Sequence, residues 1–184
     1  LLLRGMNIGH SRLHRWGLEA AEIHPCDKVL DVGCGGGRAI ARILARTRRE
    51  VAGVDHSPEA VETTRRLNRS AIASGRLRVL EGSVDHLPFR DGFFDVVTAF
   101  ETTYFWPDLQ AGLIEIRRVL SPGGRLVITN EVADREAAGR WAERLDMNVP
   151  DGRSLTGLAH EAGFLTADIS LHPRHGWLRL LTTR

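Results

Sequence analysis

The chain is 184 residues long, with 42% hydrophobic and 26% charged residues and a formal net charge of +2. That size suits one domain with a single sizeable core, and the composition is that of an ordinary globular protein. No apolar run approaches the ~18 residues that a membrane span needs. Acidic residues are interspersed among the basic ones, so the mild charge does not indicate nucleic-acid binding. We therefore expect a cytoplasmic protein that binds neither nucleic acid nor membranes.

The two cysteines, Cys26 and Cys34, lie close together in the sequence and have no wider framework of thiols. This spacing does not suggest disulfide bonding, and it fits a reducing compartment. Neither cysteine has partners at the spacing of metal ligands, so we expect no metal site.

Short apolar runs alternate with helical stretches over the first 130 residues. The predicted strands are Lys28–Val32, Glu50–Val54, Leu77–Leu80, Phe94–Ala99 and Arg125–Asn130. The predicted helices between them are Arg38–Arg49, Pro58–Ser74 and Leu109–Leu120. Continuous apolar strands indicate a parallel sheet covered on both faces, so this order predicts a doubly wound α/β fold.

The remainder of the chain departs from this alternation. Two helices, Asp134–Asp146 and Ser154–Ala162, precede two strand-like stretches, Ala167–Leu171 and Trp177–Thr182. The few residues between these last stretches permit an antiparallel hairpin but no parallel crossover. We predict a Rossmann-like, mostly parallel, seven-stranded sheet that closes on a C-terminal antiparallel hairpin.

The most informative motif is the glycine-rich turn from Gly33 to Gly37, between the first strand and the first helix. Glycines permit a positive φ and allow a ligand to lie against bare backbone. The N–H groups at the following helix start are unpaired and carry a partial positive charge, which suits a flat or anionic ligand. The dinucleotide fingerprint needs a small residue where this chain has Arg38, so a nicotinamide dinucleotide is disfavoured.

Together with the motifs that follow it, the chain resembles class I S-adenosylmethionine (SAM)-dependent methyltransferases of the small-molecule, methyltransferase-11-like type. The motifs occur in the family's order: Val29–Gly37, Gly53–Ser57, Glu81–Phe89, Phe94–Val97, Arg118–Gly124 and Glu161–Phe164. The resemblance implies one domain over residues 1–184, with an N-terminal cap helix in 1–25 and a Rossmann-like core in 26–184. It also implies SAM as cofactor, S-adenosylhomocysteine as product and a small molecule as methyl acceptor.

Several residues are expected to bind the cofactor. Asp55 ends the second strand roughly 20 residues after the glycine turn, where two carboxylate oxygens suit the ribose diol. The alternative for Asp55 is a helix cap, but Ser57 already stands in that position. His56 either lies against the adenine or is a plain turn residue. The resemblance places Ser83 and Val84 at the adenine edge, with plain loop residues as the alternative. It likens Asp31 to the acid that organises the glycine turn and the methionine end of SAM, with a polar strand end as the alternative. It also makes cofactor-binding residues of Gly33, Cys34, Gly35 and Gly37.

Glu101 and Tyr104 follow the fourth strand, at the sheet edge where open α/β sheets bind ligands. A carboxylate at Glu101 could attract the sulfonium, orient an acceptor or take its proton, and the alternative is a solvent-facing acid at a helix start. Tyr104 either stacks on the acceptor or covers the core. In the N-terminal segment Asn7, His10 and Trp16 are candidates to line the site; alternatively, the helix is simply packed and His10 is solvated.

Three functions remain open at this point. A methyltransferase needs only to align acceptor and methyl group within about 3–3.5 Å and to exclude water, and no metal is required. A non-catalytic SAM-binding module would carry the same motifs, whereas a dehydrogenase would need the nicotinamide binding that Arg38 disfavours. The small cap favours either a modest acceptor or a site that a second subunit completes in a homodimer.

Overall fold

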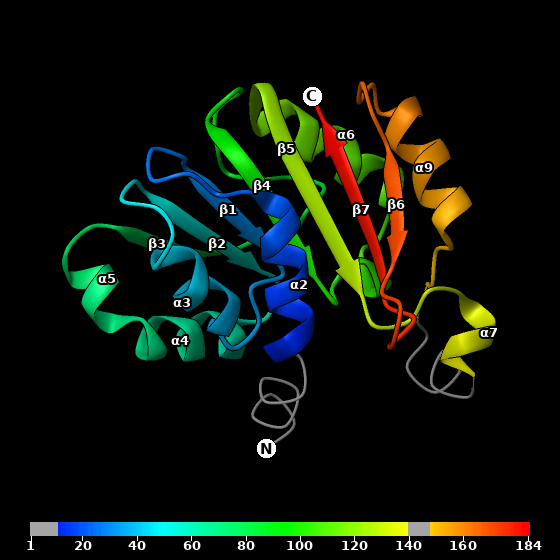
Figure 1. Cartoon of the computed structure of the whole chain (residues 1–184). Coiled ribbons are helices and arrows are strands. Elements are labelled where there is room, and N and C mark those ends of the chain that lie inside the picture. The colour runs from blue at the N-terminus through cyan, green and yellow to red at the C-terminus, as the bar shows by residue number, and fades with distance from the viewer. Residues whose placement is uncertain (1–10, 140–147) are drawn as a thin grey trace.

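The computed structural model describes residues 11–139 and 148–184. Seven strands form one sheet in the order β3-β2-β1-β4-β5-β7-β6 (Figure 1). The parallel strands are β1 (Val29–Val32), β2 (Val51–Asp55), β3 (Leu77–Glu81), β4 (Phe94–Phe100) and β5 (Leu120–Asn130). The antiparallel hairpin consists of β6 (Asp168–Leu171) and β7 (Leu178–Thr183), and β7 also pairs with β5. The predicted parallel sheet with its closing hairpin is confirmed.

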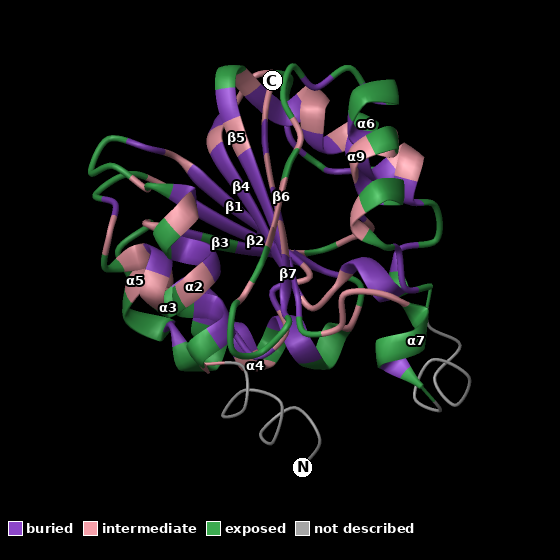
Figure 2. Cartoon of the chain, turned by 45° about the vertical axis from the view of Figure 1, so that its right-hand side comes forward, coloured by how far each residue is buried: buried purple, intermediate pink, exposed green. Residues whose placement is uncertain are grey.

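Helices cover both faces of the sheet, as expected from the continuous apolar strands. One face packs against α2 (Ser11–Ala21), α3 (Arg38–Leu44), α4 (Pro58–Leu67) and α5 (Arg69–Ala73). The other face packs against α6 (Leu109–Val119) and α9 (Gly152–Glu161). Two hydrophobic clusters therefore lie on either side of strands that are buried along most of their length (Figure 2). None of the described helices is both long and apolar enough to cross a membrane.

Most element boundaries lie within two residues of the predictions, and three differ by more. The single helix expected over Pro58–Ser74 is divided at Asn68, whose buried side-chain amide donates to the carbonyls of Gly37 and Thr64. The strand expected over Arg125–Asn130 begins earlier, at Leu120, because Leu120 already pairs with Phe94 before the register shifts. The helix expected to end at Arg49 ends at Leu44.

Past β5, the short helix α7 (Arg135–Ala138) forms the start of the helix expected over 134–146, and most of the rest of that helix lies outside the described residues. The two N-terminal candidates Asn7 and His10 also lie outside them.

Helix α2 is packed directly on the sheet. A Cβ added at Gly17 would lie 2.4 Å from Phe100 Cε1 and 2.5 Å from Thr129 Oγ1, so only glycine allows this approach. Trp16 points toward the hairpin, where its ring lies 6.3 Å from Trp177 and 4.4 Å from the Arg179 guanidinium. Trp16 thus packs on the hairpin and lines neither of the two lobes described below, which fits the alternative of a packed helix.

Candidate functional site

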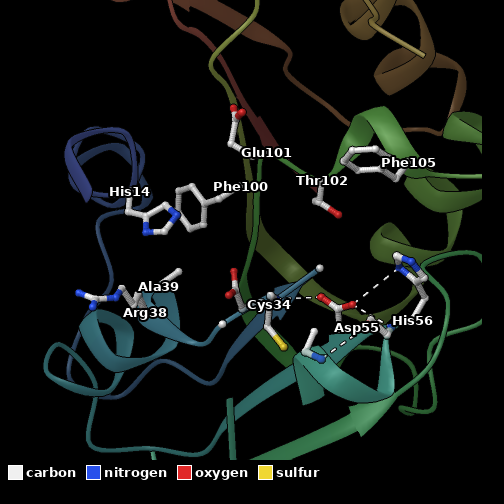
Figure 3. A pocket seen from close by; sticks show the side chains of 16 residues that line it. His14, Cys34, Arg38, Ala39, Asp55, His56, Phe100, Glu101, Thr102 and Phe105 are labelled. Atoms are coloured by element: carbon white, nitrogen blue, oxygen red, sulfur yellow. Dashed lines mark hydrogen bonds and ion pairs between the residues drawn. The ribbon is translucent and has the colours of Figure 1, made fainter. Parts of the chain in front are cut away.

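A cavity with two lobes lies at the carboxyl edge of β1, β2 and β4. Figure 3 shows the first lobe. The first lobe has a volume of about 190 Å³ and the second about 170 Å³. Both lobes are lined by Gly33, Asp55, His56, Thr102 and Phe105, so the two lobes adjoin one another. The strand order reverses between β1 and β4, and open α/β sheets place their ligands at such a switch point.

The glycine turn brings bare backbone to the first lobe. Gly33, Gly35 and Gly37 have φ values of 69°, 51° and 76°, which L side chains rarely adopt. A Cβ at Gly35 would meet no other protein atom closer than 4.0 Å, so this position faces the cavity itself. Gly37, expected to bind cofactor, instead packs against Thr64 outside both lobes.

Cys34 contributes to the lining of the first lobe, but its side chain is buried beside α4. The thiol lies 3.9 Å from Thr64 Oγ1, and burial raises the pKa of the Cys34 thiol. The Thr64 hydroxyl in turn donates to the carbonyl oxygen of Gly35 at 2.7 Å. Cys34 and Thr64 therefore hold the glycine turn against α4, while Cys26 is exposed elsewhere.

The Asp55 carboxylate lies at the junction of the two lobes and braces the turn. Its two oxygens accept hydrogen bonds from the backbone N–H groups of Gly35, at 2.8 Å, and Ser57, at 3.0 Å. Ser57 caps α4, as predicted, by accepting from the N–H of Ala60. Each carboxylate oxygen has two lone pairs, so Asp55 retains acceptor capacity toward the cavity.

Asp31 lies beneath the first lobe and is 2% exposed. Its Oδ1 accepts a hydrogen bond from the Thr98 hydroxyl at 2.7 Å. Burial raises the pKa of Asp31 from 3.8 to about 7, and the negative charge of Asp55 adds to this increase. A buried acid whose pKa lies near neutrality is typical of functional sites.

The second lobe contains the residues expected at the adenine edge. Ser83 and Val84 line it together with Trp106, and Val84 is buried. His56 lies at the rim of both lobes with its side chain 78% exposed, and its Nδ1 is 3.7 Å from Asp55 Oδ1. This lobe therefore presents a mostly apolar slot with polar groups at its mouth.

Glu101 lies at the first lobe, immediately after β4, with an unusual backbone conformation. Its φ of 58° places a non-glycine residue in the left-handed region, which is rare outside constrained sites. In Figure 3 its side chain extends away from Asp55 and Cys34. The carboxylate accepts a hydrogen bond from the N–H of Glu131 and also interacts with the Tyr104 hydroxyl.

Burial raises the pKa of Glu101 from 4.5 to about 8, and the nearby charge of Glu131 contributes in the same direction. These contacts argue against the alternative of an acid that simply faces solvent.

Tyr104 is placed behind Glu101 and does not line either lobe. It is 3% exposed, and its hydroxyl accepts from the N–H of Val132 at 3.0 Å. The aromatic residue that reaches both lobes is Phe105, which is 47% exposed. Of the two readings of Tyr104, its burial fits the one in which it covers the core.

Sequence reasoning did not identify His14 and Arg38 as lining residues. His14 of α2 is 7% exposed, and its ring centroid lies 5.0 Å from that of Phe100, beside the first lobe (Figure 3). His14 precedes Gly17 by three residues and Leu18 by four, and this helical spacing could have indicated that His14 lies on the buried face of α2. Arg38, which disfavours a dinucleotide, also borders this lobe.

This arrangement defines a class of protein with an open α/β sheet that binds an extended ligand across its switch point. The methyltransferase domain family matches residues 30–128, more than half of the chain, so the chain belongs to this family, whose cofactor is SAM.

Relatives found by sequence similarity are also named as methyltransferases. The chain is 30% identical over 149 residues to O-methyltransferase cnsE of Penicillium expansum, covering 78% of this chain and 54% of that protein. It thus spans about half the length of such curated relatives.

Solved structures show the same fold. A putative methyltransferase in complex with the Trm112 activator of Haloferax volcanii has a TM-score of 0.86, with 23% identity over 98% of this chain and 92% of that one. Geranyl diphosphate methyltransferase in complex with SAM has a TM-score of 0.80, with 18% identity over 95% of this chain and 85% of that one. At these identities the structures establish the seven-stranded Rossmann-like fold alone.

Proposed function

We propose that this chain transfers a methyl group from SAM to a small-molecule acceptor. The observation that carries the proposal is the pair of adjoining lobes, with the bare backbone at Gly35 in the first, the slot beside Val84 in the second and the Asp55 carboxylate lining both. Together the lobes fall in the lower part of the range of roughly 300–1,000 Å³ that is usual for small-molecule sites. When bound, SAM supplies a methyl group that is already activated on a sulfonium.

The residues present fit this cofactor. Gly35 offers an open cradle that a Cβ would fill, and Asp55 has lone pairs available for ribose hydroxyls. In this proposal Ser83 and Val84 hold the adenine, while the first lobe above Asp31 holds the methionine end. The remaining task of the chain is to align the acceptor and exclude water.

Glu101 is the group proposed to orient or deprotonate the acceptor. With a pKa of about 8 it is protonated at lower pH, where it can donate a hydrogen bond, and becomes a base as the pH rises through that value. Tyr104 and the N–H of Glu131 hold the carboxyl in place, so we assign Tyr104 a positioning role.

The relatives support a small acceptor without fixing its identity. The fungal relative is named as an O-methyltransferase, and a structural neighbour is named for geranyl diphosphate. We propose that the acceptor is modest in size or that a second subunit completes the acceptor side. Sedimentation would reveal the homodimer that this arrangement allows.

Calorimetry with SAM, S-adenosylhomocysteine and NAD tests the cofactor. We expect binding of the first two and none of NAD, and the reverse result would refute the proposal. Incubation with SAM and the small-molecule fraction of a cell extract should then release S-adenosylhomocysteine. Binding without release would identify a non-catalytic SAM-binding module instead.

The variant Glu101→Gln then tests the acceptor side. It should bind SAM within a few-fold of the wild type and lose about 10²–10⁴ in turnover. The exposed Glu62 of α4 offers a matched control, Glu62→Gln, which should retain full turnover. Normal turnover of Glu101→Gln would remove Glu101 from the mechanism.

A further inference from the structure

Four arginines form a positively charged strip along α2 and α3. Arg38, Arg42 and Arg46 recur every four residues in and just after α3, so they share one face. Arg15, exposed on α2, adds a fourth charge that acts on Arg42. We call these four residues the arginine strip.

The strip has no neutralising partner among the residues that the structure describes. The Arg42 guanidinium donates to Ser11 Oγ at 2.6 Å and to the carbonyl of Arg38 at 3.0 Å, both uncharged acceptors. Burial is the largest cause that lowers the pKa of Arg42, and the charges of the other three arginines lower it further. Elsewhere in the described chain, by contrast, ion pairs with carboxylates engage Arg78, Arg118 and Arg125.

One end of the strip borders the candidate site. Arg38 lines the first lobe together with His14, while Arg46 lies two turns further along the helix axis, at a distance of roughly 12 Å. Like charges at this spacing repel one another, so the strip is destabilising until an anion binds. Guanidinium groups pair with phosphate and carboxylate oxygens through two parallel hydrogen bonds, which makes such groups the fitting ligands.

We propose that the arginine strip binds an extended oligoanionic part of the methyl acceptor, composed of phosphate or carboxylate groups. The acceptor would then run along α3 and reach the first lobe past Arg38 and His14. The link to the acceptor rests on the proposed function, whereas anion binding by the strip does not.

Titration of the protein saturated with S-adenosylhomocysteine tests the strip. The probes are tripolyphosphate, citrate and orthophosphate at low ionic strength, and calorimetry measures their binding. Tripolyphosphate or citrate should bind at least tenfold more tightly than orthophosphate, and added salt should weaken the binding. The stronger of the two probes identifies phosphate or carboxylate as the preferred group.

The double variant Arg15→Gln/Arg42→Gln should lose about tenfold in affinity for that probe and keep its affinity for S-adenosylhomocysteine within twofold. Neither residue lines the cavity. A matched control, Arg69→Gln/Arg153→Gln, removes the same charge from exposed positions on α5 and α9 and should retain binding.

Equal losses in both double variants, or equal affinity for all three anions, would overturn the proposal. Displacement of S-adenosylhomocysteine by tripolyphosphate would also overturn it, because the strip would then belong to the cofactor site. Failure of S-adenosylhomocysteine to bind at all would count against the proposed function, while the comparison of variants in the ligand-free protein would still test the strip.

Discussion

Replacing Glu101 with glutamine should stabilise the protein at alkaline pH and leave its stability at acidic pH nearly unchanged. Burial raises the pKa of this carboxyl from 4.5 to about 8. Between these values the unfolded chain binds fewer protons than the folded protein, so the free energy of unfolding of the wild type falls as the pH rises. Glutamine cannot ionise, and the variant therefore escapes this loss.

The size of the effect follows from the same two pKa values. At about 1.4 kcal/mol for each pKa unit, the ceiling above pH 8 is about 5 kcal/mol. Water that reaches the rim of the first lobe reduces this ceiling, so we expect a difference of about 1–3 kcal/mol at pH 8.5 and under about 0.5 kcal/mol at pH 5.

Urea unfolding of both proteins at pH 5 and pH 8.5 measures this difference. Asp31, whose pKa is also raised by burial, titrates in both proteins and so cancels in the comparison. The exposed Glu62 of α4 again provides the control, because Glu62→Gln should preserve the pH profile of the wild type. A difference between Glu101→Gln and the wild type that does not change with pH would refute the reasoning.

Three further outcomes are expected. Asp55→Ala removes the acceptor of two backbone N–H groups, so calorimetry should show at least a tenfold loss of SAM affinity and thermal unfolding should begin earlier. Gly17→Ala should destabilise the protein by about 1–3 kcal/mol through overpacking, whereas Gly157→Ala, in an open position on α9, should stabilise it; urea unfolding distinguishes the two. A thiol reagent should label Cys26 in the folded protein and Cys34 only after denaturation, and rapid labelling of both would show that the glycine turn opens.

The sheet could be predicted from the sequence because its determinants are local. Continuous apolar runs such as Val51–Val54 distinguish buried parallel strands from half-exposed ones, and the short stretch before Trp177 leaves only an antiparallel connection. The glycine turn and Asp55 were also identifiable, since their spacing is fixed by the strand and helix between them.

Other features depend on contacts between distant residues, which no local pattern records. The break at Asn68 exists because its amide reaches back to Gly37, and the divided helix therefore could not be read from propensity. His14 comes to the site only through the packing of α2 on the sheet. The burial of Tyr104 depends on the backbone of Val132, which lies in the segment after β5.

One contact in the glycine turn links the affinity for SAM to the sequence of the loop after β4. The position a Cβ would take at Gly33 is only 2.0 Å from Thr102 Oγ1, so the loop after β4 supports the turn after β1. A larger side chain at Thr102 would push directly on the backbone that lines both lobes. A change at Thr102 that adapts the loop to a new acceptor should therefore carry a cost in SAM affinity.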